Sequence, residues 1–354
     1  MNIRVIYCYL FILAGWLVSA CGGHRSGDTV LESFGKHAIV LTPTEIIDLE
    51  SYGFEMPAEP TVVGDWVALS EAVSIERHIS LLNYRTGEHF PLLLHGRGPG
   101  ELQNPSFRTV RDSCLILIDQ SSRVAVSVPI RLSAEAGRAV MDTIARFDTA
   151  VPYVSRYVPA VGGQFITTLF SPTDPCWYAL RDSLGNVVST IPPPAFPVLE
   201  KMSPSLLGSF LGSSSIVTNP EGDRVCVAMA PACVLSFSSI EGNSLKEYYR
   251  LEACPPPIVG QGDGSSYAAD LRTYFGVSCA DGQYIYYLYA NKDGFAEIPG
   301  YECEHLLVFD WQGNPCCHYE LIYPASGICM YGGKLYCTTT YPESRLYIYD
   351  GVLQ

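Results

Sequence analysis

Short apolar runs alternate with polar, glycine-containing turns along most of this chain. Residues 306–321 (LLVFDWQGNPCCHYEL) show the pattern clearly, as an apolar run, a polar turn around Gly313 and Asn314, and a second run. Two apolar runs joined by a tight turn of this composition predict a β-hairpin. The Asp310 side chain, three residues before the turn glycine, is expected to cap the turn through bonds to the backbone.

The same arrangement recurs at residues 82–88 (LNYRTGE) and 180–186 (LRDSLGN). In each copy an apolar residue stands five positions before the turn glycine, and Tyr84 or Asp182 takes the place of Asp310. Recurrence of one hairpin along a chain is the signature of a repeated β architecture.

Six sets of predicted strands can be grouped, at about fifty residues per set, which suits propeller blades. They cover residues 61–94, 111–130, 157–191, 214–251, 277–321 and 327–349, with an early strand in 37–49 expected to close the ring against the C-terminus. The pattern predicts an all-β, six-bladed β-propeller. A seven-bladed ring that uses the early strand and the more helical stretch 133–147, or a pair of β-sandwiches, is the alternative.

The first twenty residues predict a secretory leader. Arg4 precedes the apolar run 5–18, and the sequence then reads Val-Ser-Ala-Cys up to Cys21. The run is too short for a comfortable membrane span and resembles a lipoprotein signal peptide. We therefore expect residues 1–20 to be removed, Cys21 to carry lipid, 21–36 to form a flexible tether and 37–354 to form a single domain; an uncleaved N-terminal anchor is the alternative.

The net charge of the chain limits the classes of partner that it is expected to bind. The net charge is −14, and only 16% of the residues are charged. A nucleic acid or an anionic membrane surface requires a basic patch, so neither is an expected partner.

The thirteen cysteines do not form a regular disulfide framework. Removing Cys8 with the leader and assigning Cys21 to lipid leaves eleven, an odd number. Cys316 and Cys317 are neighbours on a predicted strand and point to opposite faces, so they cannot easily bridge each other. Most of these cysteines are expected to be buried free thiols.

The segment 95–102 (HGRGPGEL) is the most distinctive short motif. Its glycines alternate, unlike the spacing of a dinucleotide-binding loop, so a tight crossing loop is expected. Propellers usually bind ligands where inner strands and crossing loops meet at the channel mouth. On that ground the candidate ligand-binding residues are Arg97, Glu101, Asp270, Arg272, Asn291 and Asp293.

No metal, cofactor or catalytic residue is assigned. Five possible zinc ligands surround the hairpin at 306–321, but pairing through its turn sets His305 opposite Glu320 and Cys303 opposite Ile322, so the ligands do not converge. The tyrosines of 284–290 (YIYYLYA) could stack on sugar rings, but packing within the blade is the better explanation.

These motifs together resemble a known family. The lipobox, the GRGPGE loop, the YIYYLY strand and the closing FDWQGNP, GGKLY and LYIYD segments look like bacterial lipoproteins of the TolB-like six-bladed β-propeller family (BF3164-like). The resemblance implies a propeller, a lipid anchor and a bacterial cell-envelope location, on a periplasmic or surface face of the outer membrane. That family brings no established activity.

Two functions are therefore expected from the sequence. The first is a non-enzymatic binding or scaffold module for a protein, peptide or glycan. The alternative is a metal-assisted hydrolase or lyase, with a divalent ion held by carboxylates and amides at the channel mouth.

Overall fold

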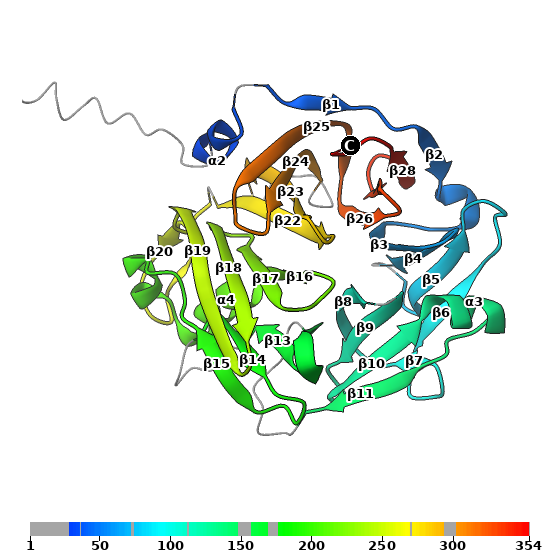
Figure 1. The fold of residues 1–354 in the computed structure, drawn as a ribbon, viewed down its shortest axis with the longest axis horizontal. Coiled ribbons are helices and arrows are strands. Elements are labelled where there is room, and N and C mark those ends of the chain that lie inside the picture. The colour runs from blue at the N-terminus through cyan, green and yellow to red at the C-terminus, as the bar shows by residue number, and fades with distance from the viewer. Residues whose placement is uncertain are drawn as a thin grey trace, which may run out of the picture.

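Six small, mainly antiparallel sheets stand in a ring, as the predicted propeller requires (Figure 1). This computed structural model describes residues 28–35, 37–71, 74–111, 113–147, 157–168, 176–269, 271–293 and 302–353, with the backbone alone for 106–110 and 291–293. We number the blades one to six, starting from the blade that holds β3.

Blades one to three take up the first half of the ring. Blade one contains β3 (Pro57–Val63), β4 (Trp66–Glu71), β5 (Arg77–Asn83), β6 (His89–His95) and β7 (Glu101–Leu102). Blade two contains β8 (Pro105–Arg111), β9 (Cys114–Asp119), β10 (Val124–Pro129) and β11 (Asp142–Arg146). Blade three contains β12 (Val158–Pro159), β13 (Phe165–Thr168), β14 (Tyr178–Arg181) and β15 (Val187–Ile191).

The second half of the ring holds the longer hairpins. Blade four contains β16 (Ser214–Thr218), β17 (Arg224–Met229), β18 (Cys233–Glu241) and β19 (Ser244–Cys254), and a small hairpin, β20 (Ile258–Val259) with β21 (Ser266–Tyr267), follows it. Blade five contains β22 (Arg272–Ala280), β23 (Tyr284–Asp293), β24 (Cys303–Asp310) and β25 (Pro315–Ala325). Blade six contains β26 (Gly327–Tyr331), β27 (Lys334–Thr339) and β28 (Arg345–Tyr349).

The core consists of layers between the blades. Six hydrophobic clusters each join residues of two neighbouring blades around the ring. The middle strands are covered on both faces, and for this reason they appear in the sequence as nearly continuous apolar runs, such as β9, rather than as a clean alternation.

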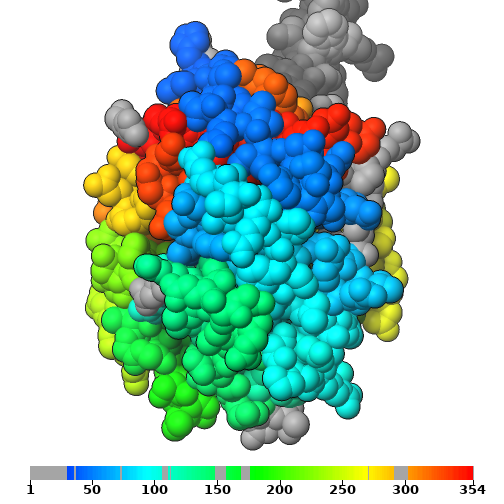
Figure 2. Space-filling view, turned by 90° about the vertical axis from the view of Figure 1, so that its right-hand side faces the viewer, coloured from blue at the N-terminus to red at the C-terminus, as the bar shows by residue number. Residues whose placement is uncertain are grey.

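The N-terminal segment closes the ring. β2 (Glu45–Asp48) pairs antiparallel with β28 and becomes the outer strand of blade six, while β1 (Ile39–Leu41) pairs parallel with β25 of blade five. The predicted closure against the C-terminus is confirmed, and Figure 2 shows the N-terminal segment lying against the C-terminal one. Because β2 completes a six-bladed ring, it is not part of a seventh blade.

The stretch 133–147, whose composition is more helical and which the seven-bladed alternative would use, is divided between two elements. Helix α3 (Ile130–Ala136) follows β10, and its chain then returns as β11, the outer strand of blade two. This segment therefore completes blade two.

The predicted tether is folded over part of its length. Within 21–36, residues Asp28–Ser33 form helix α2, and Val30 is 2% exposed because it packs into the cluster between blades four and five. Phe34 meets Phe309 edge to face, with ring centroids 5.0 Å apart. The expectation of a flexible tether is therefore wrong for 28–35, because apolar residues follow its polar start.

The turn caps agree with the repeat in two of its three copies. Asp310 Oδ1 accepts from the amides of Gln312 and Asn314 at 2.9 and 2.8 Å, and Asp182 Oδ1 accepts from those of Leu184 and Asn186, both at 2.9 Å. In blade one the cap is instead Asn83, four residues before Gly87, so Tyr84 does not take the aspartate's place. The aspartate cap is confirmed for Asp310 and Asp182.

Candidate functional site

A cavity of about 770 Å³ lies among the inner strands and is the candidate site. Residues of β3, β16, β22 and β26 line it, together with the β17–β18 turn and the loop after β27. Its volume lies within the range of about 300–1,000 Å³ that is usual for ligand pockets.

We call this cavity the channel. Its wall consists mainly of apolar side chains and hydroxyl groups. Among the described lining residues, Glu59 is the only carboxylate, and none is lysine or arginine. The polar wall groups are mostly serine and threonine hydroxyls, with the phenols of Tyr267 and Tyr331. Such a surface suits a ligand that is largely uncharged.

Three wall hydroxyls lack a hydrogen-bond partner within the described part of the chain. They are the Tyr267 phenol, the Thr340 Oγ1 and the Ser215 Oγ, and all three atoms are buried. A buried polar group without a partner is costly, so it usually marks a place where water or a ligand completes the bonding. Burial also raises the pKa of Tyr267 to about 12, which keeps it a neutral phenol able to donate.

The backbone of β3 is strained where it meets the channel. Met56 and Glu59 have φ angles of 56° and 47°, although neither is glycine. The register of β3 with β4 shifts between Ala58 and Thr61. Gly327 makes this conformation possible, since a Cβ there would lie only 2.7 Å from the Glu59 amide nitrogen.

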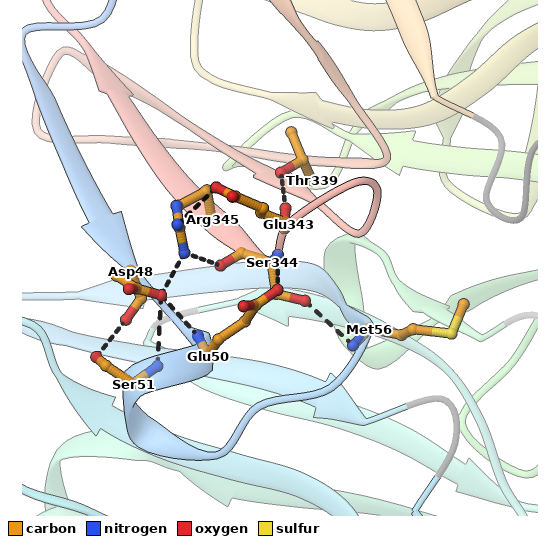
Figure 3. Close-up of polar contacts among 8 residues, drawn as sticks. All are labelled: Asp48, Glu50, Ser51, Met56, Thr339, Glu343, Ser344 and Arg345. Carbon is orange, nitrogen blue, oxygen red and sulfur yellow. Dashed lines mark hydrogen bonds and ion pairs between the residues drawn. The ribbon is translucent and has the colours of Figure 1, made fainter.

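Polar contacts at the ring closure support this strained segment (Figure 3). The Met56 amide donates to Ser344 Oγ at 3.3 Å, and the Ser344 amide donates to Glu50 Oε1 at 3.0 Å. Arg345, the first residue of β28, pairs with Asp48 at the end of β2 and with Glu343 of the loop between β27 and β28. Channel wall and ring closure are thus one connected structure.

The Cys279 thiol in the wall is not activated. Cys279 and Cys329 line the channel, and burial raises the pKa of Cys279 well above its ordinary value. A thiol with a raised pKa remains protonated at neutral pH and is a poor nucleophile.

The structure separates the predicted ligand residues. Glu101 lies on β7, four strands outward from β3, where its carboxylate accepts from the Gly98 amide at 2.7 Å and holds the glycine loop together. Arg97 is exposed on the same loop. Neither residue lies at the channel mouth, because the loop joins the two outermost strands of its blade.

Of the candidates whose side chains the structure describes, Arg272 lies nearest to the channel. It begins β22 between Leu271 and Thr273, which both line the cavity, and its register partner is Asp293. Asp270 and the side chains of Asn291 and Asp293 lie outside the described residues, as does Cys21.

The hairpin of β24 and β25, which carries the five possible zinc ligands, brings His305 and His318 together. His305 lies opposite Glu320 as predicted, but Cys303 pairs with Ala325 rather than Ile322, since the register shifts between Cys303 and His305. His318 Nε2 lies 3.1 Å from His305 Nδ1. Within the described ranges, no three or more His, Cys, Asp or Glu side chains are placed to hold a metal.

The tyrosine-rich strand serves packing. Tyr286, Tyr287 and Tyr289 are 1%, 0% and 0% exposed, inside the clusters on either side of blade five. They are not available to stack on a sugar, so the packing interpretation is correct for these three.

Sequence reasoning missed the channel wall itself. Residues such as Thr273, Ser278 and Thr340 resemble ordinary strand residues, and only the closure of the ring turns them toward a common cavity. Their one signal is a higher share of serine and threonine in the inner strands than in the middle strands.

Comparison with solved structures supports the fold. A Bacteroides fragilis protein assigned as exported is 10% identical, with a TM-score of 0.51 over 90% of this chain and 95% of that one. BamB of Moraxella catarrhalis (12% identity, 88% and 100% covered, TM-score 0.43) and a gluconolactonase of Xanthomonas campestris (12%, 89% and 96%, 0.48) are more distant.

No protein-family model matches the sequence, and no curated protein is significantly similar to it. Across the described residues, no helix has the length and apolar character needed to cross a membrane. At such low identities the likeness shows the β-propeller fold alone, so this chain is a six-bladed β-propeller.

Proposed function

We propose that this protein is a lipid-anchored, non-enzymatic binding module of the bacterial cell envelope, which receives an uncharged peptide segment of a partner protein in its central channel. The observation that carries this proposal is the set of buried hydroxyls of Ser215, Tyr267 and Thr340, which have no partner among the described residues, on the wall of a largely apolar cavity. A peptide supplies both kinds of group that this wall needs, because its amides bond to hydroxyls and its apolar side chains fill the remaining space.

The channel favours peptide over glycan. Aromatic rings that could stack on a sugar are not offered by Tyr286, Tyr287 and Tyr289, because all three are buried in packing. The absence of lysine and arginine among the described lining residues also makes an anionic ligand unfavourable.

The proposed lipid anchor and envelope location are inferred from the sequence. The leader pattern and Cys21 support lipid attachment, and export would place the propeller in the envelope. With the anchor at Cys21 and helix α2 beginning at Asp28, only a short chain would separate the membrane from the folded domain.

The metal-assisted hydrolase has less support. It requires several convergent carboxylates or amides at the channel, whereas the lining residues described here include the single carboxylate of Glu59. No specific observation favours this second function.

Blocking the channel tests the proposal. Purified full-length protein is incubated with detergent extracts of cell envelopes and with libraries of uncharged peptides, and retained species are identified by mass spectrometry. Thr273→Trp places a large side chain in the channel, while Leu184→Trp adds the same side chain to the turn of blade three, where Leu184 is 83% exposed.

Wild type and Leu184→Trp are expected to retain the same peptides, and Thr273→Trp is expected to lose them. Circular dichroism confirms that both variants are folded. Equal retention by all three proteins, or no retention by wild type, would rule out a channel site for peptides.

A further inference from the structure

One pair of cysteines is arranged across a hairpin. Cys233 is the first residue of β18, Cys254 is the last residue of β19, and their Cα atoms are register partners. Residues directly opposite in an antiparallel pair have Cα atoms about 4.5–5.5 Å apart, and a disulfide accepts about 4.4–6.8 Å. The backbone therefore already has the spacing that a disulfide needs.

The two side chains also meet. Directly opposed residues project from the same face of a sheet, and both side chains are buried, at 0% and 4% exposure. The two thiols form a hydrogen bond with each other. This contact and, as the second cause, burial raise the pKa of Cys233. They are unbridged in this structure.

We propose that Cys233 and Cys254 are the site of a structural disulfide that forms when the protein is exported. The inference rests on the envelope location in the proposed function, because disulfides form and persist in oxidising compartments. It does not depend on what the channel binds.

The reaction is a thiol–disulfide exchange. One cysteine, as a thiolate, attacks the disulfide of an envelope thiol oxidase and forms a mixed disulfide; the second thiolate then displaces the oxidase sulfur. The Sγ–Sγ bond forms, the oxidase S–S bond breaks, and the two electrons and the two thiol protons convert the oxidase disulfide to a dithiol. Since both side chains are buried in the folded blade, the exchange takes place before blades four and five pack together.

Among the residues that the structure describes, no other two cysteines are register partners. Cys316 and Cys317 are adjacent on one strand, and Cys226 accepts a hydrogen bond of 3.3 Å from the Tyr287 phenol. Among the described cysteines, the pair at 233 and 254 is thus distinguished by its register.

The bridge would stabilise the channel wall. Cys233 follows the β17–β18 turn, in which Ala230 and Pro231 line the channel, and the Ala230 carbonyl accepts from the Tyr274 amide at 3.0 Å. Cys254 precedes the segment that leads to Tyr267 and Leu271, two further wall residues. A disulfide would tie both wall segments to the same point of blade four.

Peptide mapping tests the inference. Full-length protein from envelopes is denatured without reductant, alkylated, and digested with trypsin, which places Cys233 in peptide 225–246 and Cys254 in peptide 251–272. The expected product is these two peptides linked through Cys233 and Cys254, with Cys226 alkylated, and the link is lost on reduction. A second sample is refolded with oxidised and reduced glutathione, so that the geometry is tested apart from export.

Variants supply the controls. Cys233→Ala should leave Cys254 fully alkylated, whereas Cys316→Ser with Cys317→Ser should leave the link unchanged. Reductant should lower the urea midpoint of wild type and leave that of Cys233→Ala with Cys254→Ala unaffected. Alkylation of both cysteines in the envelope and the refolded samples would overturn the inference, whatever the peptide-binding experiment shows.

Discussion

The amide of Ser344 donates a hydrogen bond of 3.0 Å to the carboxylate of Glu50, across 294 residues of sequence. It fastens the segment after β2 to the loop between β27 and β28. The same serine accepts from the Met56 amide through its Oγ, so the ring closure and the strained start of the channel wall share one side chain.

Ser344→Ala should therefore destabilise the protein. Ser344 is 3% exposed, and its loss leaves the Met56 amide without a partner, which costs about 1–2 kcal/mol in the free energy of unfolding. Urea denaturation followed by fluorescence measures the change. Ser51→Ala, which removes an exposed bond to the Asp48 carbonyl, is the control and should cost less than about 0.5 kcal/mol. Equal effects of the two variants would contradict the role assigned to Ser344.

Asp310→Ala should weaken the hairpin of blade five. The carboxylate accepts from two backbone amides and from the Asn314 side-chain amide at 2.8 Å, so its removal should cost about 1–2 kcal/mol of unfolding free energy. Gln312→Ala, in the same turn, is the matched control and should be nearly neutral. If both variants unfold at the same urea concentration, the cap does not stabilise the turn.

Asp119 should make stability fall in acid. Burial alone would raise its pKa, but the Ser122 hydroxyl at 2.6 Å and the amides of Asn104, Gln103 and Ser121 outweigh burial and lower the pKa below 3.8. The stabilisation is thus complete above pH 3.8 and is lost as the pH falls through the lower folded-state pKa. Asp119→Asn should be less stable at pH 7 and lose less stability between pH 5 and pH 3, as urea midpoints across this range will show. Parallel pH curves for the two proteins would disprove the prediction.

The His305 and His318 pair should make the N-terminal helix pH-sensitive. Burial, and then the neighbouring His305, lowers the pKa of His318 below 6.5, partly opposed by Glu320. A lowered histidine pKa means that the unfolded chain takes up the proton first, so stability declines as the pH falls below 6.5. Phe34, which follows α2, contacts the His318 ring, with centroids 6.3 Å apart, so proteolysis near α2 should increase at pH 5.

His318→Gln should remove most of this acid response, whereas His89→Gln, at the exposed start of β6, should keep it. Limited proteolysis at pH 7.5 and pH 5 provides the readout. An unchanged acid response in His318→Gln would assign the effect to other groups.

Tyr267→Phe separates binding from stability. The phenol is buried without a partner among the described residues, so its removal should leave the unfolding free energy unchanged or raise it by up to about 1 kcal/mol. Loss of the hydroxyl should lower the affinity of the channel for a bound peptide about 5-fold, which is equivalent to about 1 kcal/mol. Tyr331→Phe is the comparison variant, because it removes the hydroxyl of the other lining tyrosine, the last residue of β26. Clear destabilisation by Tyr267→Phe would show that the phenol has a structural partner.

Much of the fold could be predicted because each blade carries local information. The Asp182 and Asp310 turns, the Gly332–Gly333 hairpin and the buried runs of the middle strands depend on residues close together in sequence. Register across irregular strands could not be predicted in the same way. Cys303 pairs with Ala325 because a shift in the ladder interrupts simple counting from the turn.

The candidate site was less accessible to sequence reasoning. The charged residues of the glycine-rich segment 95–102 are predicted from the sequence to bind a ligand. In the structure, Glu101 instead holds its own loop together at the outer edge of a blade. Wall residues such as Tyr267 and Thr340 lie in different segments, and each resembles a residue that could be buried in a blade.

The sequence by itself determined the strands, the turns and the six-part repeat, because hairpins form from neighbouring residues whose alternation and turn chemistry are local. Only the tertiary structure decided the channel, the meeting of Cys233 with Cys254 and the strained backbone at Met56. These features depend on the rotation between blades and on the pairing of β2 with β28, which unite residues from both ends of the chain. No local pattern specifies which side chains then face the common axis.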